Sequence, residues 1–505
     1  MRPPLLTKRG TIPLHKTGIR FNRKDFEYDV YSLVRAFYPH SDTEMYYEGE
    51  EPAGEYELLL LVTYQTDGIE LEILREGRTA LARKVPVEFD RDRQETKNVL
   101  KRLVYDALKE LTGNSLPWGD LTGIRPTKIP MKLLEEGWKN TDIAGYMRQT
   151  YEVSDAKCAL AITIANRERA ILRQFDYEKG WSLYVGIPFC PSICLYCSFG
   201  SHPLEVWKKR VDEYLDALIR ELTFIRDQMA GRPLHSVYIG GGTPTTLTPE
   251  QSRRLLGAIE ELFDLSHVRE YTVEAGRPDT ITGEKLQVLR HFPVSRISIN
   301  PQTMNQKTLD LIGRKHTVED VVRIFGMARE LGFDNINMDL IVGLPGEGET
   351  EVDRTLSQVE QLGPDSLTVH SLALKRATRL NLFKDQYEEI SFANSAAIMD
   401  HTQACARRMG MGPYYLYRQK NIAGNFENVG YARPGCEGLY NILIMEEKQS
   451  IIAAGAGAST KFVFDGGRRI ERAENVKSVD QYISRLEEMI ERKRAGIEKY
   501  LRPDA

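Results

Sequence analysis

Three cysteines stand within eight residues of one another: Cys190, Cys194 and Cys197, in the stretch "GIPFCPSICLYCSFG". The chain has six cysteines in 505 residues, and the other three stand alone. Such sparse use argues against a disulfide scaffold and for a reducing compartment, where a local cysteine group more often binds metal. We therefore expect the three thiolates to surround one inorganic centre.

The spacing of the three cysteines favours an iron–sulfur cluster over zinc. A structural zinc site usually takes four ligands, often as two C-x2-C pairs, and the remaining cysteines carry no such motif. A cubane [4Fe–4S] cluster can be held by three thiolates, which leaves one iron open to a non-protein ligand. In the competing interpretation the cysteines are small core hydrophobes, which fits poorly with Pro191 and the polar loop around it. The C-x3-C-x2-C pattern thus predicts a cluster with an open iron.

The cysteines follow the first of six apolar, β-branched runs that alternate with amphipathic helical patterns. These runs are "LYVGIPF", "SVYIGGG", "YTVEAG", "SRISINPQ", "INMDLIVGL" and "SLTVHSLAL". Strands joined by helical crossovers pair in parallel, and successive crossovers of one hand curl the sheet toward a barrel. Because six strands are present and not eight, we expect an α/β fold built on an open, partial (β/α)6 barrel.

The sequence on either side of the barrel predicts three further parts. Short β-rich runs from about residue 26 to 87, then the helical pattern "RQETKNVLKRLVYDALKEL", predict an N-terminal α+β domain at 1–115. The Pro- and Gly-rich stretch "PWGDLTGIRPTKI" opens a helical linker region at 116–178. The barrel with its cluster then spans 179–380, and a C-terminal α/β extension at 381–505 covers the substrate.

The composition is that of an ordinary globular protein. A net charge of -4 gives no general attraction to nucleic acid, so no nucleic-acid partner is expected. The longest apolar run, "LLLLV", is far shorter than the roughly 20 residues that a membrane-spanning helix needs, and no secretory signal is present. The first 24 residues are basic and interrupted by proline. We expect a cytoplasmic protein without a membrane span.

Distinctive polar residues also follow the later strands. Active sites of parallel α/β barrels lie at the carboxyl ends of the strands. The glycines of "YIGGGTPT" end the second strand, Glu274 ends the third, Gln302 ends the fourth, and Asp339 lies within the fifth. Glycine there would let backbone N–H groups approach a ligand. These residues and the cysteines are therefore expected at one rim.

A cysteine triad after a first barrel strand, with a glycine triplet ending the second, resembles the radical S-adenosylmethionine (radical SAM) superfamily. The resemblance implies a [4Fe–4S] cluster on Cys190, Cys194 and Cys197, whose open iron binds SAM and cleaves it to methionine and a 5'-deoxyadenosyl radical. Across residues 180–460 the closer resemblance is to the oxygen-independent coproporphyrinogen III oxidase branch, through "YVGIPFC", "YIGGGTPT", "INPQTMNQKTLDLIGRKH" and "MDLIVGLPGE". The N-terminal region looks like that of a long coproporphyrinogen dehydrogenase subgroup.

The resemblance also implies which residues bind SAM. Tyr184, Gly241 and Glu274 match positions that contact the cluster-bound SAM; Tyr184 and Glu274 are the candidate catalytic residues, and Glu274 could accept hydrogen bonds from ribose hydroxyls. Positions that contact a second SAM in that branch are matched by Tyr196, Gly242, Thr243, Gln302, Arg314, Asp339 and Ala373. An electron donor such as flavodoxin or ferredoxin is implied too.

The implied activity is oxidative decarboxylation of coproporphyrinogen III propionates to vinyl groups, giving protoporphyrinogen IX in haem biosynthesis. An anionic tetrapyrrole substrate needs basic partners. Five candidates lie near the expected mouth of the barrel: Lys375, Arg376, Arg379, Arg418 and Lys420.

Two alternatives stay open: a tetrapyrrole-binding haem chaperone, and a radical SAM enzyme with another substrate. The oxidase carries a further cysteine where this chain has Phe199. The haem chaperones carry a histidine where this chain has Tyr440, and an aromatic pair where it has Ile444 and Met445.

Overall fold

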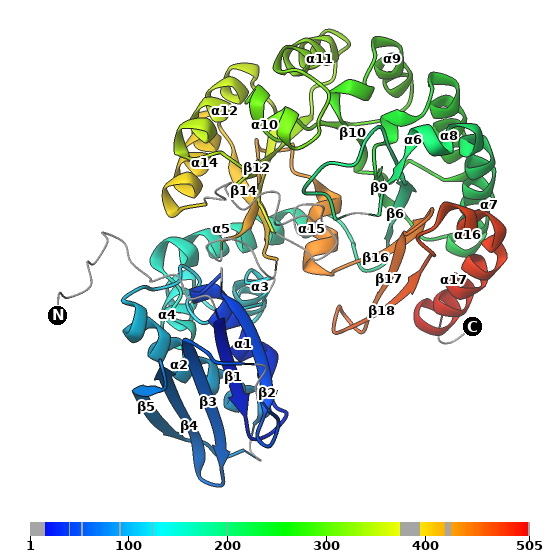
Figure 1. Cartoon of the computed structure of the whole chain (residues 1–505). Helices are drawn as coiled ribbons and strands as arrows, with labels where there is room; N and C mark the ends of the chain where they lie inside the picture. The colour runs from blue at the N-terminus through cyan, green and yellow to red at the C-terminus, as the bar shows by residue number, and fades with distance from the viewer. Residues whose placement is uncertain are drawn as a thin grey trace. The chain divides into compact units, whose positions relative to one another are not determined.

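The computed structural model describes residues 16–39, 41–51, 54–89, 92–123, 125–198, 200–373, 394–419 and 426–502. The chain forms two compact units, which Figure 1 shows in blue to cyan and in cyan to red. Unit 1 comprises Met1–Ile162 and Arg418–Glu427; unit 2 comprises Thr163–Tyr417 and Asn428–Ala505. The four-part division proposed from the sequence remains a prediction.

Unit 1 is an α+β domain with a five-stranded sheet in the order β2-β1-β3-β4-β5. Its strands are β1 (Lys16–Phe21), β2 (Asp42–Tyr47), β3 (Leu58–Gln65), β4 (Gly68–Arg75) and β5 (Arg78–Pro86), and its helices α1 (Glu27–Phe37), α2 (Arg93–Thr112), α3 (Lys128–Glu135) and α4 (Asn140–Tyr151). Helix α5 (Asp155–Leu172) begins in this unit and ends in unit 2.

Helix α1 corrects the sequence interpretation, which placed residues 27–37 among the β-rich runs. Val30, Leu33, Val34 and Phe37 are buried, and they recur at the three- and four-residue spacing of one helix face. This face packs in the core of the α+β domain, so tertiary burial outweighs the β-propensity of valine and tyrosine.

Unit 2 contains the predicted open barrel. Six parallel strands lie side by side in chain order, and the first and last do not pair with each other. The strands are β6 (Trp181–Ile187), β9 (Leu234–Gly241), β10 (Glu270–Gly276), β11 (Arg296–Ile299), β12 (Ile336–Val342) and β13 (Ser366–Ser371). The crossover helices are α7 (Val211–Met229), α8 (Pro249–Leu262), α9 (Gly283–His291), α10 (Gln306–Leu311), α11 (Val318–Glu330) and α12 (Glu349–Leu362). Figure 1 shows the longer helices as an outer arc around the strands.

The C-terminal part of unit 2 extends both edges of this sheet. Beside β13 run β15 (Asn428–Ala432) and β14 (Gly412–Tyr417), and beside β6 run β16 (Ser450–Ala454), β17 (Ser459–Phe464) and β18 (Arg469–Glu474). The helices are α14 (Ala396–Arg408), α15 (Leu439–Glu446), α16 (Val479–Ser484) and α17 (Leu486–Leu501). Strand β16 pairs with β6 in parallel, Ile452 opposite Leu183, so the sequence run expected only to cover the barrel joins its sheet.

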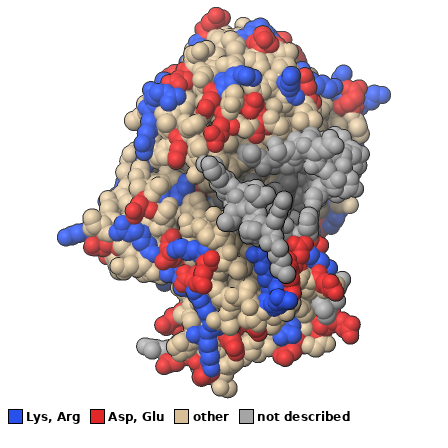
Figure 2. All heavy atoms as spheres, turned by 60° about the vertical axis from the view of Figure 1, so that its left-hand side comes forward, with Lys and Arg blue, Asp and Glu red and all other residues tan. Residues whose placement is uncertain are grey.

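The surface charges and the hydropathy of the described helices agree with the expectations from the composition. In Figure 2 acidic and basic side chains are intermixed on the face shown. Among the described helices, none is both long enough and apolar enough to cross a bilayer.

Candidate active site

The three cysteines lie on the loop after β6. Cys190 ends a two-residue strand, β7 (Phe189–Cys190), which pairs with β8 (His202–Pro203). Cys190 and Cys194 are buried, and Cys197 is partly exposed. Between Cys194 and Cys197, the N–H of Leu195 donates a hydrogen bond of 3.0 Å to the carbonyl of Ile312. The loop is thereby fastened to the segment after α10, in the other half of the barrel.

Each of two cysteines has a polar neighbour from a different strand end. Thr243 Oγ1, after β9, lies 3.5 Å from Cys190 Sγ, and Arg277 Nη1, after β10, lies 3.6 Å from Cys194 Sγ. Burial raises the pKa of the Cys190 thiol. Among the described residues no three His, Cys, Asp or Glu side chains gather closely enough to hold one metal ion. A cubane does not require such a gathering, because each thiolate binds a different iron.

The glycine triplet lets the ends of two strands meet. A Cβ on Gly242 would lie 2.5 Å from the carbonyl oxygen of Phe189, and Gly241 adopts φ +110°. The N–H groups of Gly242 and Thr243 donate to the carbonyls of Ile187 and Phe189 at 2.7 and 2.8 Å. The N–H groups of Gly242 and Thr243 therefore bind the cysteine-bearing segment, and the expectation that the triplet offers N–H groups to a ligand stays a prediction for Gly240 and Gly241.

A cavity of about 120 Å³ opens beside the cysteine loop. It is lined by Tyr184 and Gly241, which the sequence assigned to SAM, and by Ala456, Gly457 and Lys477 from the C-terminal part. The sequence analysis missed these last three. The signal for Ala456 and Gly457 was the Gly/Ala run at 453–458, whose small residues allow close approach but do not show which strand they approach; nothing in the sequence marked Lys477.

A buried ionic cluster holds this C-terminal wall in place. Glu221 of α7 accepts hydrogen bonds from the N–H of Gly455 (2.8 Å) and from Asn475 Nδ2 (2.9 Å). Tyr482 Oη and Lys493 Nζ donate to the same carboxylate, each over 2.5 Å. Both charged side chains of the ion pair are almost fully buried. Four donors satisfy the carboxylate, which offsets the cost of removing it from water.

Glu274 lies inside the barrel among stacked tyrosines. It accepts a hydrogen bond from the hydroxyl of Tyr238. The ring of Tyr238 stacks on those of Tyr440 and Tyr184, with centroids 4.3 and 6.2 Å apart. Burial raises the pKa of Glu274 from its ordinary value of 4.5 to about 7. This carboxyl therefore changes charge near neutral pH.

Three residues assigned to a second SAM meet around Asn300, which follows β11. The backbone N–H of Asp339 donates to Asn300 Oδ1 (3.2 Å), and Arg314 Nη1 donates to the Asn300 carbonyl (2.6 Å). The N–H of Gln302 donates to the carbonyl of Asp339 (3.0 Å). Gln302 has φ +70°, and its buried Oε1 has no hydrogen-bond partner. Such strain and an unsatisfied buried acceptor are typical of ligand sites.

His370 of β13 is a second group that the sequence analysis missed. Its Nε2 lies 3.9 Å from Asp339 Oδ2, and its Nδ1 lies 3.2 Å from Tyr417 Oη. Although burial opposes ionisation, the neighbouring His370 and the hydrogen bond from Asn337 hold the pKa of Asp339 below its ordinary value. A histidine at a strand end carries no sequence signal that distinguishes it from a surface residue.

The other residues that the sequence assigned to the site lie in different surroundings. Tyr196 packs beside a small apolar cluster of residues 195, 312, 341, 344 and 372, and Ala373 follows β13 with partial exposure. Arg418 belongs to unit 1, where it is buried, donates to the carbonyl of Leu121 and lies over the ring of Trp118. Several other candidates lie outside the described residues: Phe199, Lys375, Arg376, Arg379 and Lys420.

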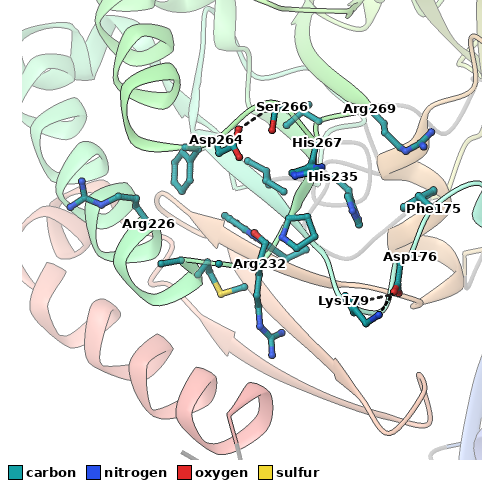
Figure 3. A pocket seen from close by; sticks show the side chains of 18 of the residues that line it. Phe175, Asp176, Lys179, Arg226, Arg232, His235, Asp264, Ser266, His267 and Arg269 are labelled. Carbon is teal, nitrogen blue, oxygen red and sulfur yellow. Dashed lines mark hydrogen bonds and ion pairs between the residues drawn. The ribbon is translucent and has the colours of Figure 1, made fainter.

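A larger cavity, of about 1000 Å³, lies where β6, β9 and β10 begin (Figure 3). Its charged side chains bind neighbouring protein groups. Lys179 pairs with Asp176, and Arg269 donates to the carbonyl of Gln174 and lies over the ring of Phe175. The cavity is at the amino ends of the strands, away from the cysteines, so the carboxyl-end rim is the candidate active site.

The residues at this rim suit the cofactors that the sequence implies. Three thiols on one loop supply the donor set for a cluster with one open iron. Glu274 and Asp339 put acidic groups in the barrel, which complement the positive sulfonium of SAM. The strained Gln302 offers a free acceptor.

Comparison with known proteins agrees with the fold and the site. The radical SAM superfamily model matches residues 184–359. The chain is 39% identical over 473 residues to the oxygen-independent coproporphyrinogen-III oxidase-like protein HemZ of Bacillus subtilis, covering 92% of this chain and 93% of that one. It is 37% identical over 198 residues to the haem chaperone HemW of Bacillus subtilis, covering 39% of this chain and 52% of that one. The solved coproporphyrinogen III oxidase HemN of Escherichia coli, a radical SAM enzyme, aligns with TM-score 0.50 and 26% identity over 64% of this chain and 72% of that one.

The matched domain defines a radical SAM protein, a class that carries a [4Fe–4S] cluster and uses SAM. The chain belongs to the radical SAM superfamily, in its oxygen-independent coproporphyrinogen III oxidase-like branch.

Proposed function

We propose that this protein is a radical SAM oxidoreductase that converts propionate side chains of coproporphyrinogen III to vinyl groups, giving protoporphyrinogen IX. Cys190, Cys194 and Cys197 hold the cluster, and Tyr184, Gly241 and Glu274 hold the SAM bound to it. When bound, these cofactors supply a 5'-deoxyadenosyl radical that removes a hydrogen atom from the substrate. Loss of CO2 and of one electron to an external acceptor then leaves the vinyl group.

The residues of the chain bind and shield the reactants. The acidic groups Glu274 and Asp339 attract the sulfonium, and the Glu274 carboxylate accepts hydrogen bonds from ribose. The tyrosine stack of Tyr184, Tyr238 and Tyr440 fills the barrel below Glu274 and excludes water that could quench a radical.

Tyr440 is the observation that favours an enzyme over a chaperone. It stands where the haem chaperones carry a histidine, yet here its ring is buried between two other tyrosines. The N–H groups of residues 439 and 440 bind the carboxylate of Glu270, which fixes the start of α15. Burial and stacking of the ring favour a packing role for Tyr440 over ligation of a haem iron. Similarity to HemW keeps the chaperone as the second candidate.

A second SAM is part of the proposal. Its contacts would be Tyr196, Gly242, Thr243, Gln302, Arg314, Asp339 and Ala373. Support comes from the free Oε1 of Gln302 and from the hydrogen bonds that connect Arg314 and Asp339 through Asn300, and Gln302 to Asp339. A one-electron carrier protein such as flavodoxin or ferredoxin would reduce the cluster.

Anaerobic cluster reconstitution followed by product analysis tests the proposal. With coproporphyrinogen III, SAM and a reductant, vinyl products and 5'-deoxyadenosine should form together. The variant Cys194→Ala should abolish both, whereas Cys405→Ala, a buried cysteine outside the triad, should change neither. Formation of 5'-deoxyadenosine without vinyl product would reject this substrate. Stoichiometric haem binding without SAM turnover would favour the chaperone.

A further inference from the structure

We propose that Arg277 sets the reduction potential of the cluster by holding a buried positive charge against Cys194. Nothing in the sequence pattern marked this arginine, which follows Glu274 by three residues on the loop after β10. The inference rests on the proposed role of the cysteine triad as cluster ligands. Arg277 would influence how easily the cluster is reduced, without contacting the substrate.

The guanidinium of Arg277 reaches from the third barrel strand to the cysteine loop. Its side chain is 4% exposed. Nη1 lies 3.0 Å from the carbonyl oxygen of Ser192, 2.9 Å from Ser192 Oγ and 3.6 Å from Cys194 Sγ. An N–H group of a cation is thus directed at one of the three thiols.

Asp279 fixes the orientation of this guanidinium. Nε lies 3.0 Å from Oδ1 of Asp279, and Nη2 lies 2.7 Å from its Oδ2, so the pair is bidentate. A planar guanidinium bound at two corners cannot turn, and its third corner is held on Ser192. Asp279 and Ser192 therefore hold Arg277 at its contact with Cys194.

The charged groups around Cys194 are positive on balance. Arg314 is a second buried guanidinium whose charge interacts with Cys194. Burial and the neighbouring Arg314 lower the pKa of His316 to about 4, so this imidazole is neutral at pH 7. Asp279 is the carboxylate paired with Arg277, and it lies 4.0 Å from His316 Nδ1; Asp320 also acts on His316.

A positive charge in this place favours the reduced cluster. With three thiolates, a [4Fe–4S] cluster carries one negative charge when oxidised and two after it gains one electron from a one-electron donor. A buried cation and an N–H···S hydrogen bond stabilise the more negative state, and both raise the reduction potential. The Arg277 guanidinium makes its direct contact with Cys194, whereas the Thr243 hydroxyl that lies 3.5 Å from Cys190 Sγ is neutral, so the effect should be largest at Cys194.

The test is the midpoint potential of the reconstituted full-length protein, without substrate, in an anaerobic titration followed by electron paramagnetic resonance. Arg277→Gln should lower the equilibrium constant for reduction by at least tenfold, which is about 59 mV for one electron. Arg277→Lys should shift it less, because the charge remains. Asp279→Asn should shift it in the opposite direction, since a negative charge is removed.

Arg167→Lys is the matched control, because this arginine of the same unit binds Glu437 and the backbone carbonyls of Gly412 and Ala432, and none of these contacts involves the cysteine triad. It should leave the potential unchanged. Equal potentials for wild type, Arg277→Gln and Asp279→Asn, with iron and sulfide content intact, would overturn the inference and leave the proposed function standing. If Arg277→Gln does not retain its cluster, the sign of the Asp279→Asn shift decides. A wild-type protein that forms no cluster would overturn both proposals.

Discussion

Replacing Glu274 with glutamine should stabilise unit 2 in a pH-dependent way. The folded protein raises the pKa of this carboxyl from 4.5 to about 7, mainly because burial disfavours its charge. Between these two values the folded state binds more protons than the unfolded state, so the free energy of unfolding of the wild type falls as pH rises and levels off above pH 7. Glutamine never ionises, and it can still accept the hydrogen bond from Tyr238.

The size of the effect follows from the two pKa values. The penalty for an ionising Glu274 is about 1 kcal/mol at pH 5 and about 3 kcal/mol at pH 8.5. Glu274→Gln should gain these amounts relative to wild type. Urea unfolding at both pH values, followed by hydrogen exchange of peptides from β9 and β10, reports on unit 2 alone.

Glu284→Gln is the control, because Glu284 is exposed on α9. The free energy of unfolding of Glu284→Gln should change with pH in the same way as that of wild type. If the free energy of unfolding of Glu274→Gln also follows that of wild type with pH, Glu274 does not titrate near neutrality and the reasoning is refuted. A second readout is the dissociation constant of SAM: for wild type it should rise about tenfold per pH unit below pH 7, while Glu274→Gln binds weakly at every pH.

Three further substitutions probe the rim. Cys194→Ala should lose cluster iron in an iron and sulfide assay, whereas Cys405→Ala should retain it; equal retention would reject the triad. Gly455→Ala should lower the thermal unfolding midpoint and weaken SAM binding, because the added Cβ would lie 2.5 Å from the carbonyl oxygen of Gly186. The control is Gly257→Ala on α8, where a Cβ meets open space; it should stabilise the folded protein by up to about 1 kcal/mol. Glu221→Gln should lower the free energy of unfolding in urea by about 3–5 kcal/mol, because it leaves Lys493 buried without a counter-charge. Glu487→Gln, which breaks an exposed ion pair with Arg220, should lower it by less than about 1 kcal/mol. Similar losses for the last two would contradict the ionic cluster.

The sequence predicts the central fold well because local patterns determine it. Each parallel strand is a short β-branched run, and each crossover helix carries its own apolar face. Cysteine spacing and the position of Glu274 at a strand end likewise need only neighbouring residues. Helix α1 was missed since Val30, Val34 and Tyr31 fit a strand equally well until the core they pack against is known.

The remaining features depend on contacts between distant segments. Nothing near Ile452 indicates that its strand pairs with β6, and nothing near Arg277 indicates that it meets Cys194. Arg418 was expected at a substrate mouth, but the ring of Trp118 and the carbonyl of Leu121 hold it in unit 1. For such residues the decisive partner lies tens or hundreds of positions away.

The pairing of β16 with β6 has a consequence for biosynthesis. The cysteine loop leaves the ribosome about 280 residues before Lys477, so it is synthesised well before one wall of the cavity beside it. At about 5–20 residues per second, this interval lasts tens of seconds. Until β16 is made, the edge of β6 that β16 covers lacks this strand partner. Iron–sulfur insertion before the chain is finished would have to occur in a barrel whose β6 edge is still open.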